Sequence, residues 1–226
     1  MSKKIIKLTI FCLLIPLVVV LGVVIFNDRA YSWVYMCVAV LSCIPLFISF
    51  EKRKSNTTLL VVLAVMIALS VAGRFIFSFL PHFKPVTAMV VITGIYLGYE
   101  CGFVCGAFTA VISNFIFGQG PWTPFQMFSW GVIGLIAGLI SKYIVDNKVL
   151  LLIYGGLSGI LYSLLMDVWT TFWYDGSFNL LRFFANVATA LPVTASYVVS
   201  NVIFLLVLIK PFGEKLNRIK TKYGIQ

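Results

Sequence analysis

Residues 117–127 read Phe117-Gly118-Gln119-Gly120-Pro121-Trp122-Thr123-Pro124-Phe125-Gln126-Met127, a break of glycine, proline and amide residues between two long apolar runs. Thr123 is predicted to cap the helix that follows, with Pro124 at its first position and Gln126 closing a capping box. Trp122 and Met127 have the spacing of a hydrophobic staple. The glycines and the proline before this helix predict a tight turn at which backbone can approach a ligand. The alternative is that the stretch only separates two helices.

The composition of the chain excludes a soluble fold. Of its 226 residues 61% are apolar and 11% are charged, and the mean hydropathy is +1.05. The apolar runs are continuous and show no strand-period alternation, which leaves helices as the spanning elements. We therefore predict an all-α, polytopic transmembrane helical bundle.

Eight apolar runs are long enough to be candidate membrane spans. The run from Pro85 to Phe117 exceeds one crossing and is split at Gly98-Tyr99-Glu100. A polar, basic linker around residues 51–58 divides residues 1–54, with two transmembrane helices, from residues 55–226, a six-helix core with a basic cytoplasmic tail. The predicted spans are residues 5–26, 31–50, 58–80, 85–98, 101–117, 123–141, 149–172 and 185–209.

The net charge of +10 reflects membrane topology and not nucleic-acid binding, because the basic residues gather in short segments between or beyond the apolar runs. With the N-terminus inside, the outer segments carry only Arg29, Lys84 and Arg182. This asymmetry predicts a multi-pass protein of the cell membrane with both termini in the cytoplasm. Residues 81–84, 117–123 and 173–177 then form loops on the outer side.

Two ionisable residues lie inside predicted spans, Arg74 in the third and Asp167 in the seventh. Charges in a bilayer are costly and face a partner or an internal cavity. Either the two side chains pair as a buried strut, or one or both present charge to a polar solute.

Aromatic residues cluster at the outer ends of the spans, near amide side chains. An interfacial aromatic belt explains many of them. Their convergence on loops that contain amides also indicates a capped aromatic pocket. The five cysteines lie in apolar runs, far from the single histidine, so no metal and no cofactor is expected. The candidate substrate-binding residues are Arg74, Asn114, Phe117, Gln119, Trp122, Phe125, Gln126, Trp130, Asp167, Trp169, Trp173 and Tyr174.

Small residues form stripes on two predicted helices. Ala64, Ala68 and Ala72 recur every four residues, a spacing that lets another helix approach closely, either within the chain or from a partner. A second face, made of Gly131, Gly134 and Gly138, is expected to serve packing inside the bundle.

Residues 58–210 resemble the substrate-binding S component of an energy-coupling factor (ECF) vitamin transporter. Three features carry the resemblance: Ala64-x-x-x-Ala68 with Ala72, the stretch from Gly94 to Gly106 leading into Ala110-Val111-Ile112-Ser113-Asn114-Phe115, and the loop of residues 117–127. It implies a six-helix core that binds a vitamin at its outer face and has no catalysis of its own. Its partners would be a transmembrane coupling subunit and two ABC ATPases, and the alanine face would dock on that subunit.

Within this family the likeness is greatest to cobalamin-type members, and several tryptophans at the pocket mouth suit a large ligand. Riboflavin, folate and a queuosine precursor remain open as substrates, because pocket chemistry differs among members. The two N-terminal helices depart from the six-helix pattern. An autonomous secondary transporter is the alternative of a different class, although no inverted repeat is evident.

Overall fold

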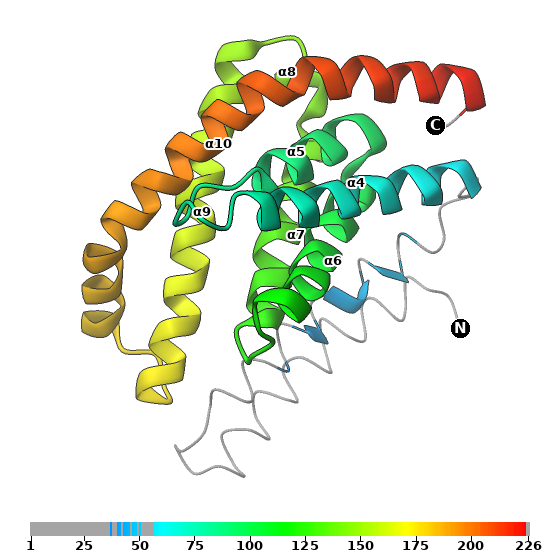
Figure 1. Cartoon of the computed structure of the whole chain (residues 1–226). Coiled ribbons are helices and arrows are strands. Elements are labelled where there is room, and N and C mark those ends of the chain that lie inside the picture. The colour runs from blue at the N-terminus through cyan, green and yellow to red at the C-terminus, as the bar shows by residue number, and fades with distance from the viewer. Residues whose placement is uncertain are drawn as a thin grey trace.

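The computed structural model describes residues 57–224, together with residues 37, 40, 41, 43–45, 47, 48 and 50. The described helices are α4 (Thr57–Ile76), α5 (Val86–Leu97), α6 (Tyr99–Phe117), α7 (Thr123–Leu139), the single turn α8 (Ser141–Ile144), α9 (Lys148–Asp175) and α10 (Leu180–Tyr223) (Figure 1). This part of the chain contains no strand. The predicted span 5–26 and the role of residues 1–54 as a separate helix pair lie outside the described residues.

Six of these helices match the six predicted spans that follow residue 57. α4, α6, α9 and α10 are long and apolar enough to cross a membrane, whereas α5 and α7 are shorter apolar helices. The predicted class, a helical membrane bundle, is confirmed. α10 runs to Tyr223, well beyond the predicted end at residue 209, and Figure 1 shows it changing direction along its length, with Pro192 and Pro211 inside it.

α5 is the central helix of the bundle. All of its residues except Tyr96 are buried, and it contacts α4, α6, α7, α9 and α10. It ends where the sequence predicted a break, because Gly98 adopts a φ of 98° that other residues rarely take. The chain turns there and α6 packs back against α5. The split of the long apolar run into two helices is therefore confirmed.

Glycines bring α6 and α7 into close contact. A Cβ atom added to Gly134 would lie 2.3 Å from the carbonyl oxygen of Gly102, and one added to Gly102 would lie 2.4 Å from the carbonyl oxygen of Gly134. A Cβ on Gly138 would meet the backbone of Tyr99 at 2.3 Å. The second small face thus serves internal packing, as predicted.

The ends of α6 and α9 lie at one end of the bundle, which we call the loop end. Arg74 near the end of α4 bonds to Asn114 near the end of α6, and Trp122 in the α6–α7 turn contacts Trp169 near the end of α9. The α6–α7 and α9–α10 connections start here. The α4–α5 loop lies midway along α10, where Lys84 bonds to Ser200, so only two of the three loops predicted to lie outside share this end of the molecule (Figure 1).

Candidate ligand-binding site

A cavity of about 100 Å³ lies between five helices and the loop that joins α4 to α5. It contains polar and aromatic side chains and two basic residues of the loop. Its lining residues are Arg74, His82, Lys84, Val86, Thr87, Gln126, Trp130, Tyr162, Tyr197 and Asn201.

Arg74 enters this cavity from the last turns of α4. Its side chain is 8% exposed, and its Nη1 donates hydrogen bonds to the Ser113 hydroxyl and, at 2.8 Å, to Oδ1 of Asn114. The rings of Phe117 and Trp130 lie 4.8 and 5.3 Å from its Cζ, in cation–π geometry. Its Nε has no hydrogen-bond partner among the described residues. The guanidinium is therefore held by neutral groups.

Arg74 and Asp167 both lie in the described part of the chain, and no ion pair joins them. The strut alternative therefore does not describe these side chains. The prediction of a pair rests only on the similar depth of the two residues in the bilayer. Which neighbour a side chain meets also depends on how each helix is rotated about its axis.

A chain of buried amides continues from Arg74 across the bundle. Nδ2 of Asn114 donates to Oγ1 of Thr123 at 2.9 Å and to Oε1 of Gln126 at 2.8 Å. Nε2 of Gln126 donates in turn to the Tyr162 hydroxyl at 3.3 Å. These bonds connect α4, α6, α7 and α9 through side chains alone.

This network explains why the predicted capping box is wrong. α7 begins at Thr123, the cap position is Trp122, and no side chain caps the helix. Oγ1 of Thr123 donates to Oε1 of Gln119 instead. A buried amide without a hydrogen-bond partner is unfavourable. Nδ2 of Asn114 therefore donates to the two side-chain oxygens that a capping box would have used.

The α4–α5 loop closes the cavity and is bound to α10. The backbone N–H of Lys84 donates to the Ser200 hydroxyl at 2.9 Å, and that hydroxyl donates to the Lys84 carbonyl oxygen at 3.0 Å. Nδ1 of His82 lies 3.3 Å from the Tyr197 hydroxyl, and His82 has a φ of 60°, which is unusual for a residue other than glycine. Two bonds from the loop backbone to the Ser200 hydroxyl and one contact between side chains thus hold this loop closed.

Burial and the nearby Arg74 charge lower the pKa of the Lys84 ammonium to about 8. Burial and Lys84 also lower the pKa of His82 below its usual value. The pKa of each group falls because a further positive charge is unfavourable beside this cavity. No aspartate or glutamate is among the lining residues.

Aromatic rings form the remaining wall and a separate row. Trp130 stacks on Tyr162 with ring centroids 5.1 Å apart, and Tyr162 meets Tyr197 edge-on at 5.1 Å. Nearer the loop end, Trp169 contacts Trp122 at 6.1 Å and Trp173 at 5.8 Å. We call Trp122, Trp169 and Trp173 the tryptophan row.

A model of the family described as "ECF-type riboflavin transporter, S component" matches residues 54–216. The chain belongs to this family. No curated protein and no solved structure matches it. The family and the apolar helices identify a multi-pass protein of the plasma membrane. Membership also means that this S component works with an ECF module and takes a vitamin as its substrate, and S components are not a class of enzyme.

The cavity gathers only part of the substrate-binding set that was predicted for this S component. Arg74, Gln126 and Trp130 line it, and Asn114 and Phe117 contact Arg74. The row holds Trp122, Trp169 and Trp173. The other four predicted residues neither line the cavity, nor contact Arg74, nor belong to the row: Gln119, which bonds to the Val111 carbonyl oxygen, half-buried Phe125, buried Asp167 and Tyr174, which is 72% exposed.

The sequence reading missed Lys84, Tyr162, Tyr197 and Asn201 as members of the site. Lys84 had been used only as a topology signal. Asn201 is a buried amide in an apolar span, and the rule that intramembrane polar groups face partners or cavities could have found it. Tyrosine carries a weaker signal, since it is also common at membrane interfaces.

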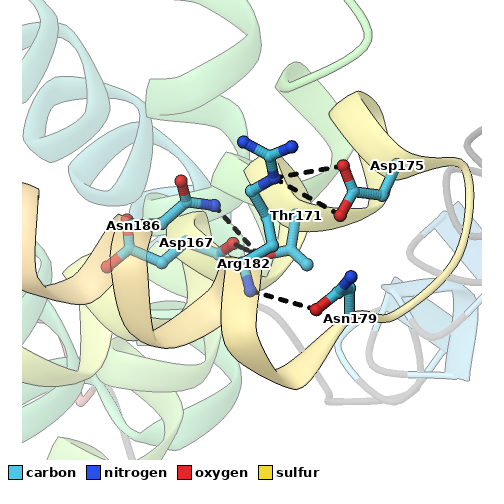
Figure 2. Close-up of polar contacts among 6 residues, drawn as sticks. All are labelled: Asp167, Thr171, Asp175, Asn179, Arg182 and Asn186. Atoms are coloured by element: carbon cyan, nitrogen blue, oxygen red, sulfur yellow. Dashed lines mark hydrogen bonds and ion pairs between the residues drawn. The ribbon is translucent and has the colours of Figure 1, made fainter.

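Asp167 belongs to the seam between α9 and α10, shown in Figure 2. It is 9% exposed, and its Oδ2 has no hydrogen-bond partner among the described residues. Its backbone carbonyl accepts a bond from Thr171, whose hydroxyl accepts one from Asn186 of α10 at 3.1 Å. At the same end of the seam, Arg182 pairs with Asp175 at 3.1 Å across the α9–α10 turn.

The alanine stripe of this S component lies on the opposite side of α4 from Arg74. Ala64, Ala68 and Ala72 are exposed and form one wall of an apolar groove of about 440 Å³ between α4 and α6. No titratable side chain lines it. The groove, which we call the alanine groove, is lined by Ala64, Ile67, Ala68, Val71, Ala72, Phe75, Ile112 and Ile116.

Proposed function

We propose that this S component binds its vitamin in the cavity beneath the α4–α5 loop and delivers it through an ECF complex. One observation carries the proposal: residues from five helices and a bound loop converge on a closed space lined by amides, aromatic rings and cations. Few, well-placed polar groups within an aromatic wall are typical of small-molecule sites.

The closed cavity is smaller than the pockets that hold whole vitamins, which are typically about 300–1,000 Å³. Entry of a vitamin therefore requires the α4–α5 loop to leave α10. The two bonds between the Lys84 backbone and the Ser200 hydroxyl, and the His82–Tyr197 contact, would break in that step. The chain thus supplies a lid that closes on the substrate from the predicted outer side.

Riboflavin is the substrate that the family description favours, and the stacked pair of Trp130 and Tyr162 offers aromatic faces to a flat ring system. Cobalamin, favoured by the sequence resemblance, is the second candidate. The tryptophan row supports it, because three adjacent indoles form an apolar surface near the loop end.

Transport would depend on partners. We propose that the alanine groove docks on a transmembrane coupling subunit that sits on two ABC ATPases, because small residues let a partner helix approach closely. ATP hydrolysis on those subunits then moves the S component and releases the vitamin into the cytoplasm, where both termini lie. The chain itself carries out no catalysis.

The test begins with the molecule that co-purifies with the full chain. Absorbance and mass spectrometry distinguish a flavin from a corrinoid, and titration with riboflavin and cobalamin then measures binding. In liposomes the chain alone is expected to move neither compound, and adding the coupling subunit and ATPases is expected to start ATP-dependent uptake. Uptake by the chain alone would favour the secondary-transporter alternative, and absence of vitamin binding would refute the proposal.

A further inference from the structure

The cavity carries positive charge without a balancing carboxylate. Arg74 and Lys84 both line it, from α4 and from the lid, and His82 lies beside them. The other lining groups that can accept a hydrogen bond are neutral amides, hydroxyls and backbone. Asp167, the buried carboxylate of the α9–α10 seam, is not among the lining residues.

Two cations around one enclosed space are unfavourable on their own. Each loses hydration on burial, and like charges repel more strongly where water is excluded. The cation–π contacts and the single donating nitrogen of Arg74 offset only part of this cost. The Nε of Arg74 also has no acceptor. A negatively charged group in the cavity would satisfy both side chains together.

We propose that the vitamin presents an anionic oxygen group, a carboxylate or a phosphate, to Arg74 and Lys84 inside this cavity. The proposal rests on the proposed function, since it assigns the charge of the substrate in the same site. The cavity of about 100 Å³ suits a group of this size better than a ring system. The ring system would then lie toward the aromatic residues.

Such a site selects against uncharged relatives of its ligand. A neutral compound leaves buried Arg74 and half-buried Lys84 without a counter-charge, and charge-assisted hydrogen bonds are stronger than neutral ones. Among flavins the site should prefer flavin mononucleotide to riboflavin, which carries no anionic group, so a preference of this kind argues against riboflavin as the substrate of this chain. Among corrinoids it should prefer cobalamin, which carries a phosphodiester, to cobinamide, which lacks one.

The experiment measures affinities of the full chain in lipid nanodiscs by calorimetry for matched pairs. The probes are flavin mononucleotide with riboflavin, cobalamin with cobinamide, and biotin with its primary amide. In the pair that binds, the anionic member should bind at least about tenfold more tightly. The same measurement is made on Lys84→Met, on Arg74→Lys and on a control, Lys142→Met, which removes an exposed lysine of α8 at the other end of the bundle.

Lys84→Met should lose most of the preference for the anion and still fold, because the bonds that hold the lid use the Lys84 backbone. Arg74→Lys keeps the charge and should retain part of the preference, and Lys142→Met should retain all of it. Equal affinity for both members of the pair, or an unchanged preference in Lys84→Met, would overturn the inference while leaving the vitamin-binding function intact. Failure of all six probes, with no vitamin co-purifying, would overturn the proposed function and the inference with it.

Discussion

Two small-residue faces in this chain look alike in sequence and have opposite surroundings. The glycine face of α7 is filled by α6, so closely that an added Cβ would collide with backbone. The alanine face of α4 is exposed and borders an apolar groove. Both spacings permit close helix approach, but among the described residues only the glycine face is packed against another helix. The difference shows that such a stripe indicates contact without naming the partner.

The largest effect is expected from filling the alanine groove. Ala68→Trp should abolish ATP-dependent uptake, because an indole keeps the coupling subunit from approaching α4. Vitamin affinity should not change, since Arg74 and the cavity lie on the other side of the helix. Uptake in cells that carry the whole transporter, and binding by the purified chain, are measured together.

The matched control for this variant is Val65→Trp. Val65 is 51% exposed on the same helix but does not line the groove. The Val65→Trp variant should take up the vitamin at the normal rate. Loss of both uptake and binding in Ala68→Trp would show that docking and binding do not use separate faces.

Filling the glycine face should damage the fold instead. Gly134→Ala places a Cβ 2.3 Å from the Gly102 carbonyl oxygen and 2.7 Å from Cγ1 of Val90, and the Gly102 backbone cannot rotate away. Overpacking of this kind costs about 1–3 kcal/mol. Thermal unfolding of the purified chain measures it. Gly156→Ala is the control, because its added Cβ meets only Val198, at 3.6 Å; equal stability of the two variants would contradict the close packing described here.

The inward side of α4 can be tested through Asn114. Asn114→Leu removes the acceptor of Arg74 and the donor to Gln126, which leaves buried polar groups unpaired at about 1–3 kcal/mol each. Stability and vitamin affinity should both fall. Asn186→Leu removes an amide with one bond, to Thr171, and should have a smaller effect on stability; the reverse order would argue against a central role for the network.

The smallest effect is a pH dependence confined to the binding side. The pKa of Lys84 is about 8 in the unliganded chain, and a bound anion would raise this pKa. The affinity for the anionic ligand should therefore have its full value below pH 8, where Lys84 is protonated. Above that pH the affinity should fall by at most about tenfold per unit, as binding must take up a proton. Docking through the alanine groove should not respond, because the groove contains no titratable group.

Other titratable groups at the cavity are Arg74 of α4, His82 of the lid, Tyr162 of α9 and Tyr197 of α10. The lowered pKa of His82 puts its titration below this range. In Lys84→Met the dependence should disappear. If the pH dependence of the affinity persists in Lys84→Met, one of the other groups causes it.

The sequence predicted the helices well and the site only in part. Hydropathy marks where each span lies, and Gly98 marks the break between α5 and α6, because both are local properties. The pairing of Arg74 is not local. Its acceptor, Asn114, lies 40 residues away, and the rotation of two helices decides that they meet.

The same reason accounts for the capping box. Thr123 and Gln126 have the right spacing for a cap, but a third residue on another helix takes their oxygens. Local rules describe what a segment does when nothing else competes. Inside this bundle, the buried Asn114 amide competes with the helix N-terminus for the side-chain oxygens of Thr123 and Gln126.

The 40 residues between Arg74 and Asn114 also order events during synthesis. α4 leaves the ribosome well before α6, and its apolar span must enter the bilayer with a guanidinium that has no amide to bind. A lone arginine near a helix end reaches for the lipid headgroups. Arg74 would therefore stay at the headgroup level until α6 arrives and then move inward, so the charged wall of the cavity is assembled late in biogenesis, after the membrane has already accepted the helix.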